Sequence, residues 1–143
     1  MIVRVSVTGA ERAAAVHAGI AARTRNLRPA MVQIGEGFRE GVEAQFQGGG
    51  WAPLKPYTIA WKGSAEKLVH TGGMAASWTI RGASGNISQE YAQRGIWGTS
   101  HGLVHWHQGG TSRMVARPVK VPPARFDSIV VNEISDYIMN GAI

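Results

Sequence analysis

Apolar and polar residues alternate at the start of the chain and then change to a helical period. Residues 2–7 place apolar side chains at almost every second position, which predicts a half-buried strand. After a Thr-Gly pair, residues 10–23 are rich in alanine and carry Val16 and Ile20 on one face, which predicts a helix. Pro29 marks a break after this helix, because a proline disfavours helical geometry in the residue before it.

A second, longer helix is predicted by a regular stripe of apolar residues that begins at this break. The members recur every three or four positions, as on the buried face of an amphipathic helix. They are Leu27, Met31, Ile34, Phe38, Val42 and Phe46. Gly35, Gly37 and Gly41 oppose the stripe, and each costs about 1 kcal/mol relative to alanine in a helix interior. We expect packing of the stripe to offset that cost, and the glycines would let another backbone approach closely.

The opposite, polar face of this helix carries acidic residues around Arg39. Glu36 and Glu43 lie three and four positions from it, and Glu40 is adjacent. Opposite charges at these spacings are typical of ion pairs on an exposed helix face. We therefore interpret these carboxylates as surface groups and not as a catalytic pair.

The second half of the chain changes from a helical pattern to a β pattern. Residues 51–62 combine aromatics and prolines without a clean period, which predicts an extended loop with one short helical turn, and residues 63–67 continue it as a polar segment. Beyond them, β-branched and aromatic runs are separated by Gly, Ser and Asn turns, which is typical of strands. The expected strands are 78–81, 91–98, 115–121 and a short one at 129–131, with a helical turn at 103–107 and a terminal helix at 133–139.

These elements predict a single α+β domain that spans residues 1–143. In it, an N-terminal strand and two helices pack on a mainly antiparallel β-sheet. Long flexible loops are expected near residues 47–67, 82–90 and 109–117, where glycine and polar residues gather.

Composition excludes several classes of protein. The chain has no cysteine, so disulfides and thiolate metal sites are excluded. No apolar run approaches the roughly 20 residues needed to span a bilayer, and the start lacks the pattern of a secretory signal. We therefore expect a protein made in the cytoplasm that has no membrane partner.

The basic character of the chain raises the question of nucleic acid. The formal net charge is +6, and the pI is about 10.3. A basic surface attracts phosphates, but here the Lys and Arg residues are scattered. The densest group, Arg23, Arg25 and Arg28, surrounds a helix boundary. A basic nucleic-acid-binding accessory protein is therefore kept as an alternative function.

Histidines invite an enzymatic interpretation, which the spacing supports poorly. His101, His105 and His107 could bind zinc as a hydrolase does, but no single helix or strand aligns all three on one face. Ser100, His105 and Asp127 lack a nucleophile elbow. The glycine run after the second helix lacks the Lys-Ser/Thr of a phosphate-binding loop. We expect no catalytic residue, no metal and no cofactor, and keep the zinc hydrolase as the weaker alternative.

Aromatic residues are concentrated in the loop that follows the second helix. Trp51, Tyr57 and Trp61 lie among glycines and prolines. Aromatic side chains are enriched at protein interfaces because they bury large areas. The pattern therefore favours either an adhesive loop or aromatics that fold back onto their own sheet.

Four ordered blocks resemble the Mu-like phage virion morphogenesis (tail completion) proteins. The first is FQGGGWAPL at 46–54, followed by Thr58 and Lys62. The second is Leu68 with TGGM at 71–74 and Ser77. The third and fourth are HQGG at 107–110 and PPARF at 122–126.

The resemblance implies a structural protein of the virion that acts in tail completion or head–tail joining at the neck, assembled in the host bacterial cytoplasm. Its implied partners are further copies of itself, in a ring that is expected to be a hexamer around the DNA channel, and neighbours such as the connector, the tail terminator or the tail tube. Proximity to DNA would be non-specific, through phosphates. The candidate interface residues are Phe46, Trp51, Pro53, Leu54, Tyr57, Trp61, Lys62, His107, Gln108 and Arg125.

Each of these assignments has an intramolecular alternative. Trp51 and Leu54 would dock against a neighbouring protein, or pack locally. Arg125 would pair with a carboxylate across an interface, or within its own chain, and the intrachain pair is favoured. His107 and Gln108 are expected to satisfy backbone groups near the sheet, with contact to a partner as the alternative.

Overall fold

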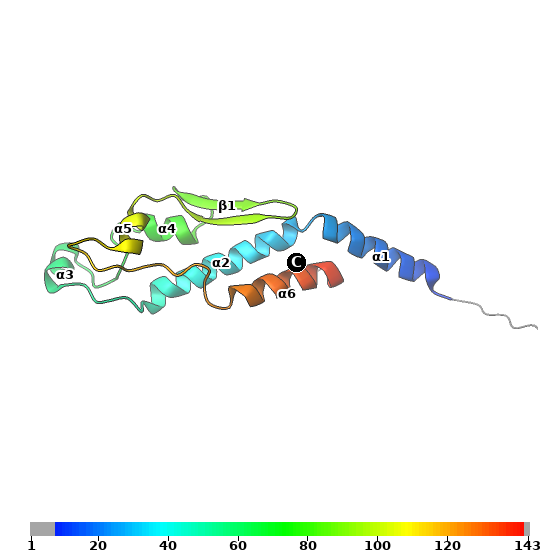
Figure 1. Cartoon of the computed structure of the whole chain (residues 1–143), viewed down its shortest axis with the longest axis horizontal. Helices are drawn as coiled ribbons and strands as arrows, with labels where there is room; N and C mark the ends of the chain where they lie inside the picture. The colour runs from blue at the N-terminus through cyan, green and yellow to red at the C-terminus, as the bar shows by residue number, and fades with distance from the viewer. Residues whose placement is uncertain (1–7, 142–143) are drawn as a thin grey trace, which may run out of the picture.

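The computed structural model describes residues 8–141, and the predicted strand at residues 2–7 lies outside them. Six helices and one two-stranded antiparallel sheet form an elongated molecule (Figure 1), so the described part has α+β composition. The helices are α1 (Ala10–Arg25), α2 (Arg28–Gly48), α3 (Pro56–Lys62), α4 (Gly73–Thr79), α5 (Leu103–Gly109) and α6 (Phe126–Asn140). The strands are β1 (Asn86–Glu90) and β2 (Gly95–Thr99).

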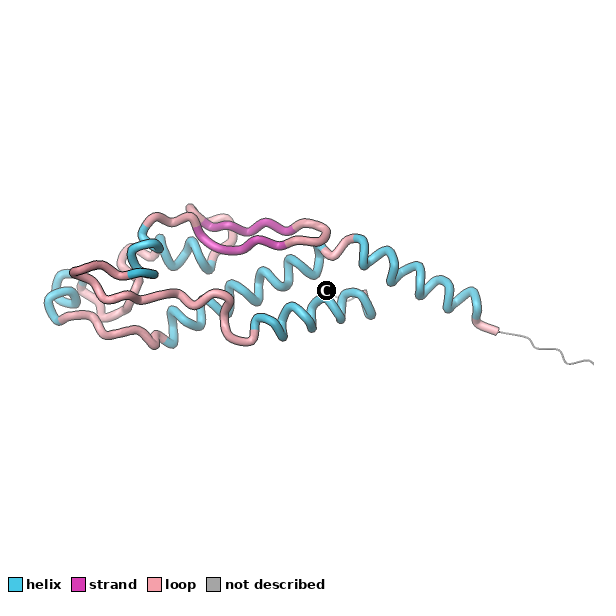
Figure 2. Tube along the Cα trace, viewed as in Figure 1, coloured by secondary structure: helices cyan, strands magenta, loops and turns pink. Residues whose placement is uncertain are grey.

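Helix α2 runs through the middle of the molecule and carries the core. Figure 2 shows α6 along one side of it and the β-hairpin along the other. The predicted apolar stripe is confirmed, because Ile34, Phe38 and Val42 are buried and its other members are half-buried. Phe38 and Val42 form the main cluster with residues from α4 and from the segment before α6. The other buried members are Met74, Trp78 and Val119.

Gly35, Gly37 and Gly41 of α2 are points of close approach, but side chains approach them and not the backbone that was expected. A Cβ on Gly35 would lie 2.4 Å from Nε1 of Trp97 on β2. The corresponding distances at Gly37 and Gly41 are 2.9 Å to Ile129 and 2.6 Å to Pro123. Because glycine has no Cβ, α2 can hold β2 on one face and α6 with its preceding segment on another.

Arg39 corrects the interpretation of the polar face of α2. Its side chain is 4% exposed, and it lies under the hairpin, where Nη1 donates to Oγ of Ser88 at 3.0 Å. Its carboxylate partner is Glu36. Arg39 is therefore an internal link between α2 and β1 and not part of an exposed charge pattern, since a buried guanidinium requires partners for its N–H groups.

The sheet is smaller than predicted. β1 pairs with β2 in antiparallel register, with Ser88 opposite Trp97. Residues 91–94 form the turn, so the strand predicted at 91–98 begins only at Gly95, and β1 occupies most of the loop expected at 82–90. Glu90 closes the hairpin: it accepts two hydrogen bonds from Arg81, at 3.1 and 2.6 Å, and one from Nε1 of Trp97 at 3.2 Å.

Three other predicted strands are wrong, each for a physical reason. Trp78 belongs to α4, where its ring is buried against α2. Residues 129–131 lie inside α6, which runs to Asn140 and packs Ile129 against Gly37 of α2. Residues 115–121 are extended but have no strand partner among residues 8–141. Tertiary packing decided these segments against local β propensity.

The remaining helix predictions hold. Helix α1 covers the predicted range and continues to Arg25, and the helical turns expected in 51–62 and at 103–107 are α3 and α5. The terminal helix begins seven residues before the predicted start, at Phe126. In the loop predicted near 109–117, Gly109 still belongs to α5, and the rest contains no helix or strand, only an isolated bridge between Thr111 and Met114.

Replacing Gly35 by alanine is expected to destabilise the protein. Overpacking against a rigid indole costs about 1–3 kcal/mol, and a Cβ at 2.4 Å belongs at the upper end of that range. The gain in helix propensity returns about 1 kcal/mol, so we expect a net loss of about 2 kcal/mol in the free energy of unfolding. Urea unfolding followed by tryptophan fluorescence measures it. Gly48→Ala is the matched control, because a Cβ there meets nothing within 4 Å. Equal or greater stability of Gly35→Ala would contradict the packing role.

Candidate functional site

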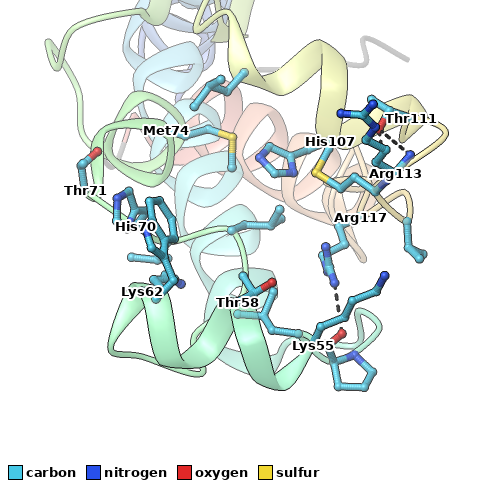
Figure 3. Close-up of a pocket in the computed structure, with 18 of the residues that line it drawn as sticks. Lys55, Thr58, Lys62, His70, Thr71, Met74, His107, Thr111, Arg113 and Arg117 are labelled. Atoms are coloured by element: carbon cyan, nitrogen blue, oxygen red, sulfur yellow. Dashed lines mark hydrogen bonds between the residues drawn. The ribbon is translucent and has the colours of Figure 1, made fainter.

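A cavity lies at the end of the molecule where the loops gather. It has a volume of about 760 Å³, and it opens between α3, the segment before α4, α5 and residues 111–117 (Figure 3). We call it the loop-end groove. Its apolar lining includes Pro53, Leu54, Trp61, Leu68, Val69, Met74, Leu103, Met114 and Val115. Its polar lining includes Lys55, Thr58, Lys62, His70, Thr71, His101, His107, Thr111, Ser112, Arg113 and Arg117.

Arg117 fixes one wall of the groove. Its side chain is buried, and its Nε and Nη2 donate to the carbonyl oxygens of Ala52 and Pro53, each at 3.1 Å. Nε1 of Trp51 donates in return to the carbonyl oxygen of Pro118 at 2.7 Å. These bonds tie the loop after α2 to a segment more than 60 residues later in the chain. Carbonyl oxygens thus provide the hydrogen bonds that a buried guanidinium requires.

Side-chain amides hold the extended segment 115–121 in place of a neighbouring strand. Gln108 donates to the carbonyl oxygen of Val119 at 3.1 Å. Gln45 of α2 both donates to the carbonyl oxygen of Lys120 and accepts from its N–H, each at 2.8 Å. A carboxamide can satisfy both backbone groups of one residue, as a paired strand would. These amide bonds hold the segment in place although it has the sequence pattern of a strand and no strand pairs with it.

The opposite wall is held more loosely. Helix α3 has no buried residue. The Trp61 ring is 69% exposed and stacks on His70, with ring centroids 5.0 Å apart. Lys62 donates to the carbonyl oxygen of Glu66, which closes the short loop after α3. The groove therefore has one rigid wall and one wall that few contacts restrain.

The groove is strongly basic. Lys55, Lys62, Arg113 and Arg117 line it together with three histidines, and its lining contains no Asp or Glu. In Figure 3, Arg117 points toward the segment that carries Lys55, where it donates to the carbonyl oxygen of Pro53. An apolar surface with cations at its edge is complementary to a ligand that combines apolar and acidic groups.

The environment of His107 disfavours its protonated form. Burial, and then the positive charge of Arg117, hold the pKa of His107 below its usual value of 6.5. Its Nδ1 is buried and has no hydrogen-bond partner among residues 8–141. Its backbone carbonyl accepts from the N–H of Arg117 at 2.7 Å. The neutral imidazole is therefore the form that suits the folded chain.

The predicted interface residues divide into two groups. The members that line the groove are Pro53, Leu54, Trp61, Lys62 and His107. Tyr57 lies beside it on α3 and is 82% exposed. Phe46 and Trp51 instead pack edge-to-face, 5.6 Å apart, at the margin of the core, so Trp51 has the local role that was the alternative, and Gln108 satisfies a backbone carbonyl as expected.

Arg125 has a backbone role. It lies in the left-handed region, with φ 63°, at the start of α6. The Lys/Arg–carboxylate ion pairs within residues 8–141 are Arg39–Glu36 and Arg81–Glu90. The favoured intrachain pair of Arg125 is therefore not formed in the described part of the chain.

Several groove residues could not be identified from the sequence. Arg113 and Met114 come from a loop that was expected to be merely flexible, and Arg117 from a presumed strand. Only the cluster of aromatics before them marked the region. His101 and His107 both line the groove, whereas His105 is exposed and contacts Trp106; within residues 8–141, no group of three His, Cys, Asp or Glu could hold a metal ion.

Comparison of the chain with protein-family models, curated proteins and solved structures found no match. Across residues 8–141, no helix combines the length and apolar character that crossing a membrane requires.

Acid is expected to destabilise the fold partly through His107. The pKa of His107 in the folded chain lies below the unfolded value of about 6.5. The contribution of neutral His107 to the free energy of unfolding is therefore present above about pH 6.5 and is lost as the pH falls towards the folded pKa. Between pH 7.5 and pH 5, His107→Asn should lose less stability than the parent chain in urea unfolding. His17→Asn on α1, where no residue is buried, should lose as much as the parent. Identical pH profiles for all three proteins would rule out this role.

Proposed function

We propose that this chain is a structural subunit of a tailed-phage particle that acts in tail completion or head–tail joining at the neck. In this proposal it has no catalytic role. Copies of it form a ring, expected to be a hexamer, around the DNA channel of the virion, and the loop-end groove docks a neighbouring protein such as the connector, the tail terminator or the tail tube.

One observation carries the proposal: motif blocks that lie far apart in the sequence converge on one groove. The first block contributes Pro53, Leu54, Thr58 and Lys62 to the lining. The second contributes Leu68, Thr71, Gly72 and Met74, and the third contributes His107. Three of the four blocks that are similar to the tail completion proteins therefore contribute to one shared surface, while Phe46, Met74 and Phe126 also pack in or against the core. This supports a docking role for the groove.

The surroundings of the groove also suit a docking surface. Large apolar side chains are exposed around it, with Tyr57 and Trp61 on α3 and Leu103 and Trp106 on α5. Contiguous exposed apolar groups of this kind mark interaction sites on soluble proteins. Because α3 is held by few contacts, a partner would order it on binding, and that cost favours assembly only with a complementary neighbour.

Nucleic-acid binding is retained as a second candidate because of a specific observation. The groove combines four Lys and Arg residues with an exposed Trp61 and no carboxylate. Cationic grooves with exposed aromatics bind single-stranded DNA by stacking. The two candidates differ in affinity, since a subunit past which DNA must slide should bind it only weakly.

Fluorescence anisotropy with a labelled single-stranded oligonucleotide separates these candidates. Under the assembly proposal, binding is weak at physiological salt and falls steeply as salt rises, because phosphate contacts release counterions. Tight binding at physiological salt that Trp61→Ala weakens about tenfold or more would favour the nucleic-acid candidate, given that stacking contributes about 1–3 kcal/mol per base.

Inactivation of the gene in its viral genome should leave filled heads and tails that fail to join, as seen by electron microscopy. The parent gene supplied in trans should restore joined particles. The double variant Lys55→Glu/Arg113→Glu should not restore them, because it reverses charge in the groove.

The matched control is Arg94→Glu/Lys120→Glu, which changes the net charge equally at exposed positions outside the groove lining, and it should restore joining. Normal particles in the absence of the gene product would overturn the proposed function. Equal restoration by both double variants would overturn the role of the groove alone.

A further inference from the structure

Among residues 8–141, helix α1 has no partner over most of its length. It has 16 residues and none is buried, and Figure 1 shows it leaving the body of the molecule beyond the C-terminal end of α6. Its link to that body is Arg23, whose Nε and Nη2 donate to the carbonyl oxygens of Ile138 and Met139 at 2.7 and 3.4 Å. A helix of about this length is marginal in water without tertiary contacts, so its free face needs a covering surface.

The free face of α1 has a distinct pattern. Val16, which is exposed, and Ile20, which is half-buried, lie one turn apart. At 100° per residue, Arg12 and His17 flank this apolar line on its two sides. The face is therefore a narrow apolar stripe with basic groups at its edges.

Helix α6 presents an outer face of complementary character. Val131 and Met139 are each 63% exposed, and Ser135 lies between them. Asp127 and Asp136 flank this line on opposite sides. The stripe is two turns long and has acidic edges.

The two helices also match in net charge and length. Helix α6 carries −3, from Asp127, Glu133 and Asp136, and no Lys or Arg. Helix α1 carries +2, from three arginines and one glutamate. At 1.5 Å per residue they are about 24 Å and 22 Å long. Opposite charge favours contact between the two helices and selects it over contact between two copies of either one.

We propose that α1 of one copy lies along the outer face of α6 in a neighbouring copy. Within one chain, α1 meets α6 near its C-terminal end, through Arg23. The link from α1 to α2 is two residues long, and the N–H of Leu27 is held by the carbonyl oxygen of Ala92 at 2.8 Å, which keeps α1 from lying along its own α6. Donor and acceptor surfaces differ, so the contact is head-to-tail and can close into a ring. The contact rests on the self-association in the proposed function and assigns it to these two helices.

Cysteine crosslinking tests the contact directly, because the chain has no cysteine of its own. Val16→Cys protein is mixed under mild oxidation with Val131→Cys, Ser135→Cys or Met139→Cys protein. We expect a reducible heterodimer with at least one of the three, since disulfides form when Cα atoms come within about 7 Å. Mixing two different variants excludes bonds within one chain.

Ala18→Cys is the matched control, because it is equally exposed on α1 but lies on the side opposite Val16. It should give at least tenfold less heterodimer. Equal yields from Ala18→Cys and Val16→Cys, or no heterodimer with any α6 variant, would overturn the contact whatever the oligomeric state.

Native mass spectrometry distinguishes failure of this contact from failure of the proposed function. The double variant Val16→Asp/Ile20→Asp should reduce the oligomer fraction at least tenfold. Its circular dichroism spectrum should still show a folded chain. Oligomers that persist unchanged in this variant would overturn the α1–α6 contact and leave the assembly function standing. Absence of the parent chain from purified particles would overturn the function itself.

Discussion

Phe38 of α2 is the side chain at which the separate parts of the molecule meet. Its ring centroid lies 6.4 Å from that of Trp78 in α4, 6.4 Å from Trp97 in β2 and 5.7 Å from Phe126 in α6. Such pairs contribute about 0.5–1.5 kcal/mol each beyond the area they bury. The arrangement requires Gly35 nearby, because any Cβ there would displace the Trp97 ring. One aromatic ring and one missing Cβ thus let a single helix hold α4, the hairpin and α6 together.

The groove is anchored to that core through the segment before α6 and through α5. Val119 is buried in the cluster around Phe38, and Arg117, two residues earlier, forms the rigid wall of the groove. Val104 of α5 packs on the same cluster. Two sides of the groove are therefore anchored to the core, whereas α3 buries nothing. A cavity built in this way keeps its basic and apolar lining in place while one wall adjusts to a ligand.

Sequence patterns predicted the helical half of this fold well and the rest poorly, for identifiable reasons. The stripe on α2 was recognised because its period is regular and its burial follows from that period alone. Trp78 was assigned to a strand because aromatic residues favour strands, but it lies on α4, where its ring packs near that of Phe38. The segment at 115–121 has the composition of a strand, yet carboxamides from Gln45 and Gln108 replace the missing partner. Such contacts join residues far apart in the chain and have no local signal.

Residues of the candidate site were likewise predicted only where the local sequence was distinctive. Trp61 was found because aromatics in a loop of glycines and prolines are unusual, and Leu54 and Lys62 were found through the resemblance of their sequence block. All three line a common surface. Arg113 and Arg117 were missed because nothing local distinguishes a groove arginine from any other in a basic chain. Trp51 was predicted as an interface residue because of the unusual composition of its loop. Its indole instead donates a hydrogen bond within the fold, to the carbonyl oxygen of Pro118.

The distribution of charge favours head-to-tail contacts over two-fold contacts in the proposed assembly. The groove lining contains cations and no carboxylate, whereas three of the nine acidic residues of the chain lie on α6. Two grooves facing each other across a two-fold axis would oppose like charges, and two α6 faces would do the same. Like-charge contacts across an interface are costly and select against such pairings. Heterologous contacts, in which a basic surface of one copy meets the acidic helix of the next, avoid this cost, and contacts of that type either close into rings or extend as filaments.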